Sequence, residues 1–190
     1  MAVCLTRAGG FFYAVSTAVL MDGAALERAL TRMAHEIVEH NPGPESLVFI
    51  GIRTHGVPLA QRLARKVGSI LKREFPIGQL DINMHRDDLS LRDQPPKVGP
   101  SDITFDVTGK DIVLVDDVLF TGRTIRAALD EISDFGRPRK IQLASLVDRG
   151  HRELPIRPDY VGKNVPTAPQ EQVRVRLAEI DGKDEVVIER

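Results

Sequence analysis

Residues 113–125 constrain the fold more than any other segment. They begin with an apolar run of strand length, continue with two adjacent acids, Asp116 and Asp117, and pass through a turn of small residues into a helical pattern. An apolar run bounded in this way is typical of a buried strand in a parallel sheet. Because strand, turn and helix form the repeating unit of α/β proteins, we expect an α/β fold.

The same alternation continues on both sides of this segment. Apolar residues recur every three or four positions in residues 24–39, which predicts a helix, and residues 47–52 form an apolar run that predicts a central strand. Residues 56–67 predict a helix with Pro58 in its first turn. The other predicted elements are strands at 79–84, 111–116 and 140–147, a helix at 124–135, and short terminal strands at 160–161, 173–177 and 186–188. This order predicts a mostly parallel central sheet flanked by helices.

The length of 190 residues suits a single domain, which we place at residues 16–190 after a loosely held N-terminal extension at residues 1–15. The apolar run at residues 9–21 is too short to span a membrane, and its flanks are weak for a signal peptide. We expect its last part, residues 18–21, to form a short strand. Residues 86–104 are charged, contain prolines and lack periodicity, which is typical of a functional flap.

The composition excludes several classes of function. A net charge of −1 gives no general attraction to nucleic acid, so an RNA partner would need a local basic patch. Cys4 is the only cysteine, and the five histidines are scattered, which excludes a disulfide framework and a cysteine-rich zinc site. This usage indicates a reducing, cytoplasmic environment with no membrane partner.

The residues around the acidic pair favour one kind of ligand. Ligands of open α/β sheets bind at the carboxyl ends of the strands, where Asp116 and Asp117 are expected. Two carboxylates suit vicinal hydroxyls, while the N–H groups of residues 121–124 and of the following helix suit a phosphate. A sugar phosphate carries both groups. The alternative is a plain strand, turn and helix with solvated acids.

This segment resembles the phosphoribosyl pyrophosphate signature of the type I phosphoribosyltransferases. The resemblance implies that Asp116 and Asp117 hold the ribose hydroxyls, and that the turn at 121–124 binds the 5-phosphate. It assigns ligand binding to Val113, Leu114, Val115, Asp116, Asp117, Val118, Leu119, Phe120, Thr121, Gly122, Arg123, Thr124 and Ile125. Arg53, Thr54 and His55 occupy the place of the superfamily's pyrophosphate loop. The implied fold has a parallel sheet, a small hood and a long flexible flap.

Residues 136–157 and 159–167 are similar to one branch of this superfamily, the PyrR family of bifunctional regulators. The resemblance implies conversion of uracil and phosphoribosyl pyrophosphate (PRPP) to uridine monophosphate (UMP) and pyrophosphate, with Mg²⁺ bound together with PRPP. It also implies binding of the pyr messenger RNA leader when the uridine nucleotides UMP and UTP are abundant, which promotes transcription attenuation. A homo-oligomer is expected from the family.

The resemblance implies roles for further residues. Uracil recognition is expected from backbone groups near Val147, Asp148 and Arg149, and no residue is expected to hold the metal directly. Many purine-specific relatives carry an acid at the position of Phe120, so no general base is evident there.

Two histidines depart from the family pattern. His55 stands where the family usually has arginine, and His85 stands where it has tyrosine. A histidine with an ordinary pKa near 6.5 is largely neutral at pH 7 and gives pyrophosphate less positive charge. We therefore expect weak or pH-dependent catalysis.

The RNA surface is expected on the first helix. Thr31, Arg32 and His35 fall on one stripe of this helix, and the family resemblance adds Arg157 and Lys163. A solvated helix face is the alternative explanation of the stripe. A plain salvage phosphoribosyltransferase for uracil or a purine, without RNA binding, is the alternative for the whole protein.

Overall fold

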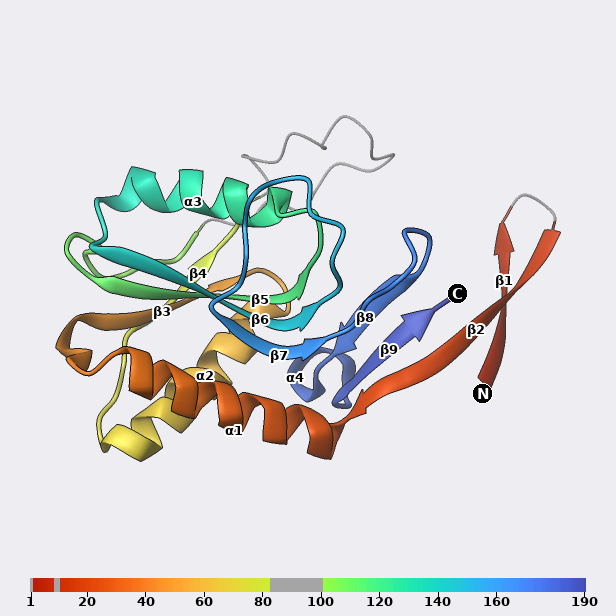
Figure 1. Ribbon diagram of the computed structural model, residues 1–190, viewed down its shortest axis with the longest axis horizontal. Coiled ribbons are helices and arrows are strands. Elements are labelled where there is room, and N and C mark those ends of the chain that lie inside the picture. The colour runs from red at the N-terminus through yellow and green to blue at the C-terminus, as the bar shows by residue number, and fades with distance from the viewer. Residues whose placement is uncertain (1, 9–10, 83–100) are drawn as a thin grey trace.

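The computed structural model describes residues 2–8, 11–82 and 101–190, with side chains from Ser16 onward. A parallel sheet lies in the body of the molecule, and an antiparallel sheet lies beside it along the long axis (Figure 1). The order of the parallel sheet is β4-β3-β5-β6-β7. Its strands are β3 (Leu47–Ile52), β4 (Ile77–Leu80), β5 (Asp111–Leu119), β6 (Lys140–Asp148) and β7 (Tyr160–Asn164). The mostly parallel central sheet predicted from the sequence is therefore confirmed.

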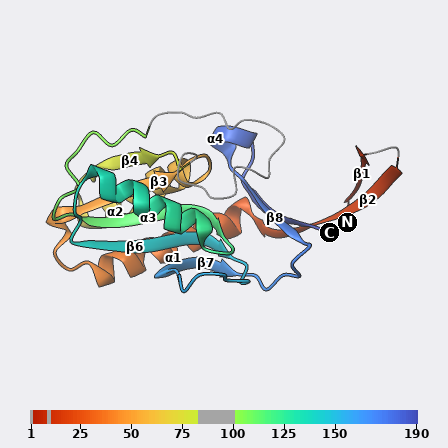
Figure 2. The same cartoon turned by 90° about the horizontal axis from the view of Figure 1, so that it is seen from above.

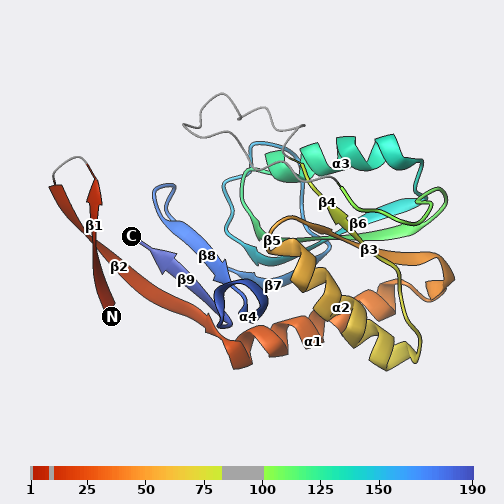
Figure 3. The same ribbon diagram turned by 180° about the vertical axis from the view of Figure 1, so that it is seen from behind.

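Helices cover both faces of this sheet. Helices α1 (Gly23–His40) and α2 (Gly56–Leu71) lie on one face, and α3 (Arg123–Phe135) lies on the other (Figures 1 and 3). Strand β5 alternates between the two layers: Val113 and Val115 pack with α1 and α2, whereas Ile112 and Leu114 pack with α3. Both faces of a central parallel strand are buried, so the run is apolar throughout.

The antiparallel sheet has the order β1-β2-β9-β8. Its strands are β1 (Ala2–Ala8), β2 (Phe11–Asp22), β8 (Gln172–Arg176) and β9 (Glu185–Glu189), and the short helix α4 (Ala178–Asp181) joins β8 to β9. We call the part formed by β2, β8, α4 and β9 the hood. The hairpin of β1 and β2 projects away from the parallel sheet (Figure 1). The short strand expected at residues 18–21 is only part of β2, which continues back to Phe11 and pairs with β1.

Several predicted boundaries were wrong. The strand predicted at 79–84 begins earlier, at Ile77, and ends at Leu80, because the Asp81 N–H donates to the Ser101 hydroxyl (3.0 Å) and not to a neighbouring strand. The strand predicted to end at Asp116 continues to Leu119, since β6 pairs with it along that length. Residues 83–100, with His85 and most of the predicted flap at 86–104, lie outside the described residues.

Local sequence explains where the helices begin and end. Asp22 caps α1 by accepting a hydrogen bond from the Ala25 N–H (2.7 Å), and α1 ends at His40, before the 3₁₀ helix η1 (Pro44–Ser46).

None of the helices within the described ranges has the length and apolar content needed to span a bilayer. Seen from above, α3 crosses the parallel sheet, while α4 lies beyond the strand ends next to β8 (Figure 2).

Candidate functional site

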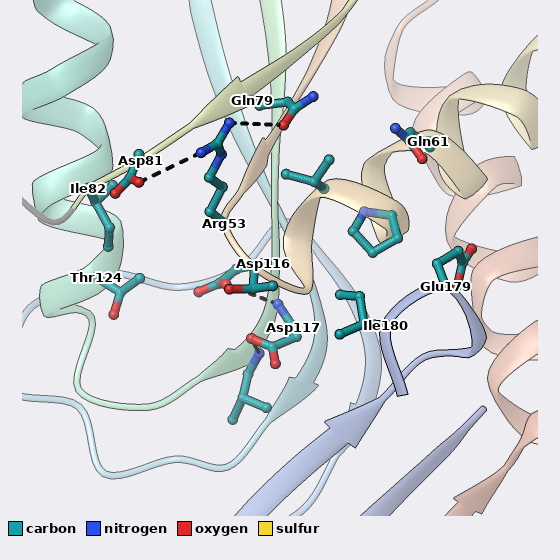
Figure 4. Close-up of a pocket in the computed structure, with 14 residues that line it drawn as sticks. Arg53, Gln61, Gln79, Asp81, Ile82, Asp116, Asp117, Thr124, Glu179 and Ile180 are labelled. Atoms are coloured by element: carbon teal, nitrogen blue, oxygen red, sulfur yellow. Dashed lines mark hydrogen bonds and ion pairs between the residues drawn. The ribbon is translucent and has the colours of Figure 1, made fainter. Parts of the chain in front are cut away.

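The acidic pair belongs to the last residues of β5, not to the loop after it. Asp116 is 6% exposed, and the Asp117 side chain is partly exposed. The Asp116 carboxylate accepts a hydrogen bond from the Asp117 N–H (3.0 Å), and the Asp117 carboxylate accepts one from the Val118 N–H (2.9 Å). These bonds orient both carboxylates at the carboxyl edge of the sheet, where they line a cavity (Figure 4).

The turn after β5 forms a small cavity of about 240 Å³. Gly122 has a φ of 94°, in the left-handed region that other residues rarely adopt, and its carbonyl accepts the Arg126 N–H (2.9 Å) as α3 begins. The cavity is lined by Asp116, Val118, Leu119, Phe120, Thr121, Gly122, Arg123 and Thr124. A helix N-terminus with free N–H groups favours an anion, so this cavity suits a phosphate.

A larger cavity of about 720 Å³ lies next to it and shares Asp116, Val118 and Thr124 with the small one. Arg53 reaches toward this cavity's upper wall, where its guanidinium lies 3.9 Å from the Asp81 carboxylate and donates to Gln79 (3.4 Å) (Figure 4). The full lining is Arg53, Thr54, Val57, Pro58, Gln61, Gln79, Asp81, Ile82, Asp116, Asp117, Val118, Thr124, Glu179 and Ile180. Arg53 and Thr54, from the loop expected to bind pyrophosphate, thus face the acidic pair across one cavity, whereas His55 is not among its lining residues.

The loop at residues 53–55 is held close to β5. A Cβ atom at Gly56 would lie 2.4 Å from the Val115 carbonyl oxygen, so only glycine allows α2 to begin so near the strand. The peptide bond between Arg53 and Thr54 is cis. His55 precedes α2, and its ring lies between two carboxylates: Nε2 is 3.1 Å from Asp181 Oδ2 and Nδ1 is 3.8 Å from Asp117 Oδ2.

Asp181, Glu179 and Ile180 were missed in the sequence. They belong to α4, and Glu179 and Ile180 line the larger cavity (Figure 4). Arg62 of α2 binds Glu179 and Asp184, and these hydrogen bonds hold the pKa of both carboxyl groups below the ordinary values. No local pattern could reveal this contact, because Arg62 lies more than a hundred positions from either acid.

The residues expected to bind the base lie at the end of β6. Val147 is fully buried, and much of the local backbone is already engaged: the Arg149 N–H donates to the Leu119 carbonyl (3.1 Å), and the Asp148 carbonyl accepts the Val165 N–H (2.8 Å). A carbonyl oxygen has a second lone pair, so this group of Asp148 can still accept.

The Arg149 side chain packs on an aromatic ring. Its guanidinium lies 4.0 Å from the centre of the Phe120 ring, and burial lowers the pKa of Arg149 from its ordinary value. The centre of the His151 ring lies 5.9 Å from the centre of the Phe120 ring, and the two rings are packed edge to face. Phe120 therefore joins the phosphate turn to the segment after β6, although no general base stands at its position.

Among the residues expected to bind RNA, Arg32 of α1 contacts β7, the strand that carries Lys163. The Lys66 ammonium donates to the Thr31 hydroxyl (3.0 Å), and Arg32 donates to the carbonyls of Val161 (2.9 Å) and Gly162 (2.6 Å). Lys163, in the same strand β7, donates to the Leu20 carbonyl (2.7 Å). His35 is exposed on α1, whereas Arg157 is exposed in the loop before β7.

The donor chemistry near the acidic pair fits magnesium that arrives with a phosphate ligand. Magnesium prefers oxygen ligands, and commonly binds through one or two carboxylates together with substrate phosphates. Asp116 and Asp117 supply carboxylates at the cavity. Across the described part of the chain, no three His, Cys, Asp or Glu side chains gather in a way that could hold a metal ion.

Solved structures with low sequence identity share this fold. The hypoxanthine phosphoribosyltransferase of Trypanosoma cruzi, in a ternary substrates complex, matches with a TM-score of 0.70 at 17% identity, over 90% of this chain and 94% of that chain. A hypoxanthine-guanine phosphoribosyltransferase of Bacillus anthracis matches with a TM-score of 0.67 at 19% identity, over 89% of this chain and 95% of that chain. The fold is therefore that of the phosphoribosyltransferases.

Sequence comparison narrows the class. The model of the family "Phosphoribosyl transferase domain" matches residues 16–180. The "Bifunctional protein PyrR" of Chloroflexus aurantiacus is 58% identical over 171 residues, covering 90% of this chain and 94% of that relative. The protein of the same name from Halalkalibacterium halodurans is 53% identical over 174 residues, covering 90% and 97%. The chain belongs to the PyrR family of phosphoribosyl transferase domain proteins.

Proposed function

We propose that the protein transfers the phosphoribosyl group of PRPP to uracil, forming UMP and pyrophosphate. We also propose that it regulates pyrimidine biosynthesis by binding the pyr messenger RNA leader in response to UMP and UTP, which promotes transcription attenuation. One observation carries the enzymatic part: the acidic pair, the phosphate turn and the loop at 53–55 surround two cavities that share Asp116, Val118 and Thr124. Identity of 53–58% to proteins named bifunctional PyrR supports both parts.

Each part of PRPP has a matching group in the site. Asp116 and Asp117 would accept hydrogen bonds from the ribose hydroxyls, and the turn at residues 121–124 would donate N–H groups to the 5-phosphate. Arg53, Thr54 and His55 would bind the pyrophosphate, which has to leave as positive charge develops at the ribose C1. Fixed donors and acceptors around that carbon lower the barrier because they need no rearrangement during the reaction.

Mg²⁺ bound with PRPP would neutralise the negative charge of the departing pyrophosphate. The protein's own contribution is to orient the ribose through Asp116 and Asp117 and to screen the reacting carbon from water. We propose that residues 16–190 form one domain for this purpose.

Uracil would bind beside the end of β6, near Val147, Asp148 and Arg149. The ring of Phe120, held under the Arg149 guanidinium at 4.0 Å, supplies a flat apolar surface at the end of the phosphate turn. A pyrimidine needs such a surface for stacking and polar groups for its edge. The Asp148 carbonyl, with one lone pair left, suits an N–H of the base.

The RNA leader would bind across α1 and β7, through Thr31, Arg32, His35, Arg157 and Lys163. Arg32 uses three of its five N–H donors on the Val161 and Gly162 carbonyls and on the Glu36 carboxylate (2.8 Å), so the remaining donors can reach RNA. We propose that the protein works in the cytoplasm as a homo-oligomer, as expected for the family.

Two assays test the proposal separately. Formation of UMP from uracil and PRPP with Mg²⁺ tests the enzyme, and a gel shift with pyr leader RNA, with and without UMP, tests the regulator. Turnover without any RNA shift would identify a plain salvage enzyme and would contradict the regulatory part. An RNA shift without turnover would contradict the enzymatic part.

A further inference from the structure

His55 connects the parallel sheet to the hood. Its ring lies between Asp117 on β5 and Asp181 on α4, and the shorter contact is the one to Asp181: 3.1 Å against 3.8 Å. Both side chains are partly exposed, the imidazole at 26% and the carboxylate at 30%. Figure 4 shows Ile180, the neighbour of Asp181, at the cavity wall opposite the Asp117 carboxylate.

The hood helix that carries Asp181 is fixed to α2. Arg62, whose side chain is 12% exposed, donates to both oxygens of Glu179 and both oxygens of Asp184, at 2.5–2.8 Å. Arginine holds carboxylates in a planar, bidentate geometry and is therefore well suited to fix a short segment. Asp181 thus approaches His55 from a fixed position.

The hydrogen bonds of Asp181 determine which ring nitrogen carries a proton. Oδ2 of Asp181 accepts the backbone N–H of Leu177 (2.9 Å), and the same oxygen faces His55 Nε2. The Leu177 bond, together with His55, holds the pKa of Asp181 below its ordinary value, so this carboxyl group is an acceptor. Nε2 must then be the donor, since a carboxylate has no proton to give.

We propose that Asp181 is a positioning residue: it holds the His55 ring with Nε2–H toward the hood, so that the loop at 53–55 is presented to the pyrophosphate of PRPP. The proposal rests on the proposed function, because it assumes that this loop binds pyrophosphate. It gives α4 a role in substrate binding through a residue that does not line the cavity itself. The competing explanation is an exposed ion pair of little consequence.

Calorimetric titration of Mg²⁺ and pyrophosphate into the whole protein tests this role without turnover. Asp181→Ala removes the acceptor, and we expect pyrophosphate affinity to fall about threefold to tenfold, the usual effect of one lost hydrogen bond. Asp181→Asn keeps an oxygen that can accept from Nε2, so its affinity should recover most of that loss. Asp130→Asn removes an equivalent surface carboxylate on α3 and should leave affinity unchanged.

A double-mutant cycle separates positioning of His55 from simple support of α4. In a His55→Ala background, Asp181→Ala should change pyrophosphate affinity by less than about twofold, because the side chain through which it acts is gone. If Asp181→Ala weakens binding equally in both backgrounds, the effect comes from α4 alone and the proposal is wrong. Unchanged affinity in the wild-type background would also overturn it.

Nitrogen NMR of the His55 ring gives a second measurement that does not depend on affinity. In its neutral form the ring should carry its proton on Nε2 in the wild type and in Asp181→Asn, and should become a mixture of tautomers in Asp181→Ala. An identical tautomer in all three proteins would overturn the proposal. The proposed function fails independently, if the wild type forms no UMP from uracil and PRPP.

Discussion

The two surfaces assigned to ligands are built in different ways. The proposed PRPP site at the end of β5 is made of short acids and backbone N–H groups, which the strand and the turn hold in place. The proposed RNA surface on α1 and β7 includes two long side chains, Arg32 and Lys163, that are already bonded to backbone carbonyls. The strand and the turn after it fix the first surface. The side chains of the second surface also link α1 to β7 and β7 to β2.

This difference predicts how each surface responds to mutation. A short acid at the sheet edge carries little packing, so its loss should remove binding and leave stability nearly intact. A long side chain that joins two elements should lose binding and stability together. Asp117→Ala and Arg32→Ala test this contrast, while Gly56→Ala and Arg62→Ala test the contacts that hold the loop at 53–55 and the hood in place; the largest effect is expected first.

Asp117→Ala should reduce UMP formation about a hundredfold or more, because one acceptor for the ribose hydroxyls is lost at the point where charge develops. Affinity for leader RNA without nucleotide should not change, since α1 and β7 are untouched. The measurement is steady-state turnover together with a gel shift, and Asp130→Ala on α3 is the matched control. Loss of RNA affinity in Asp117→Ala would show that the two surfaces are not separate.

Gly56→Ala should lower the free energy of unfolding by about 1–3 kcal/mol, the cost typical of overpacking. The added Cβ would lie 2.4 Å from the Val115 carbonyl, so α2 and the loop at 53–55 must move. Denaturant unfolding measures the change, and PRPP affinity should fall as well. Gly43→Ala is the control, because its Cβ meets its nearest neighbour at an ordinary 3.5 Å. Equal stability in both variants would contradict the close approach at Gly56.

Arg32→Ala should weaken leader RNA binding about tenfold and reduce the slope of log affinity against log salt by about one. It should also lower the melting temperature, because the bonds to Val161 and Gly162 are lost. Arg126→Ala, an exposed arginine on the opposite helix layer, is the control for charge. A variant that loses RNA affinity without any change in melting would break the proposed contrast.

Arg62→Ala should destabilise the fold by about 1 kcal/mol at pH 7, with a smaller loss in acid. The pKa values of Glu179 and Asp184 are lowered in the folded state, so their contribution is complete above the ordinary values near 4 and is lost as the pH falls through the lowered ones. Thermal melting of the variant and the wild type at pH 7, 5 and 3 measures how the difference in stability depends on pH. A difference at pH 3 as large as at pH 7 would rule out the ion pairs as its cause.

Much of the parallel sheet could be predicted because its signals are local. The apolar run of β3 and the periodicity of α1 each reflect burial of the same residues that carry the pattern. The turn at Gly122 could also be predicted, since a left-handed residue between strand and helix favours glycine. The acidic pair was placed at the right sheet edge, although inside β5 and not after it.

The hood's part in the site could not be predicted in this way. Asp181 reaches His55 across 126 positions of the chain, and the residues around it show no motif. His55 was interpreted from its side chain alone, as a weaker substitute for arginine. Its environment is set by a carboxylate from helix α4 of the hood, which only the tertiary structure reveals. Finding such a pair from sequence would require correlated substitutions at the two positions in an alignment of related proteins.

The bonds of Arg32 and Lys163 have an evolutionary consequence. A lineage that stopped using RNA control would still keep both residues, because selection for a stable fold preserves the links from α1 to β7 and from β7 to β2. Their presence in a relative would therefore be weak evidence that this relative is a regulator. His35 is exposed, and the structure gives it no hydrogen bond to another described residue. In such a lineage it would therefore be substituted before Arg32 and Lys163. Its presence or loss is the better marker of which relatives still control their operons.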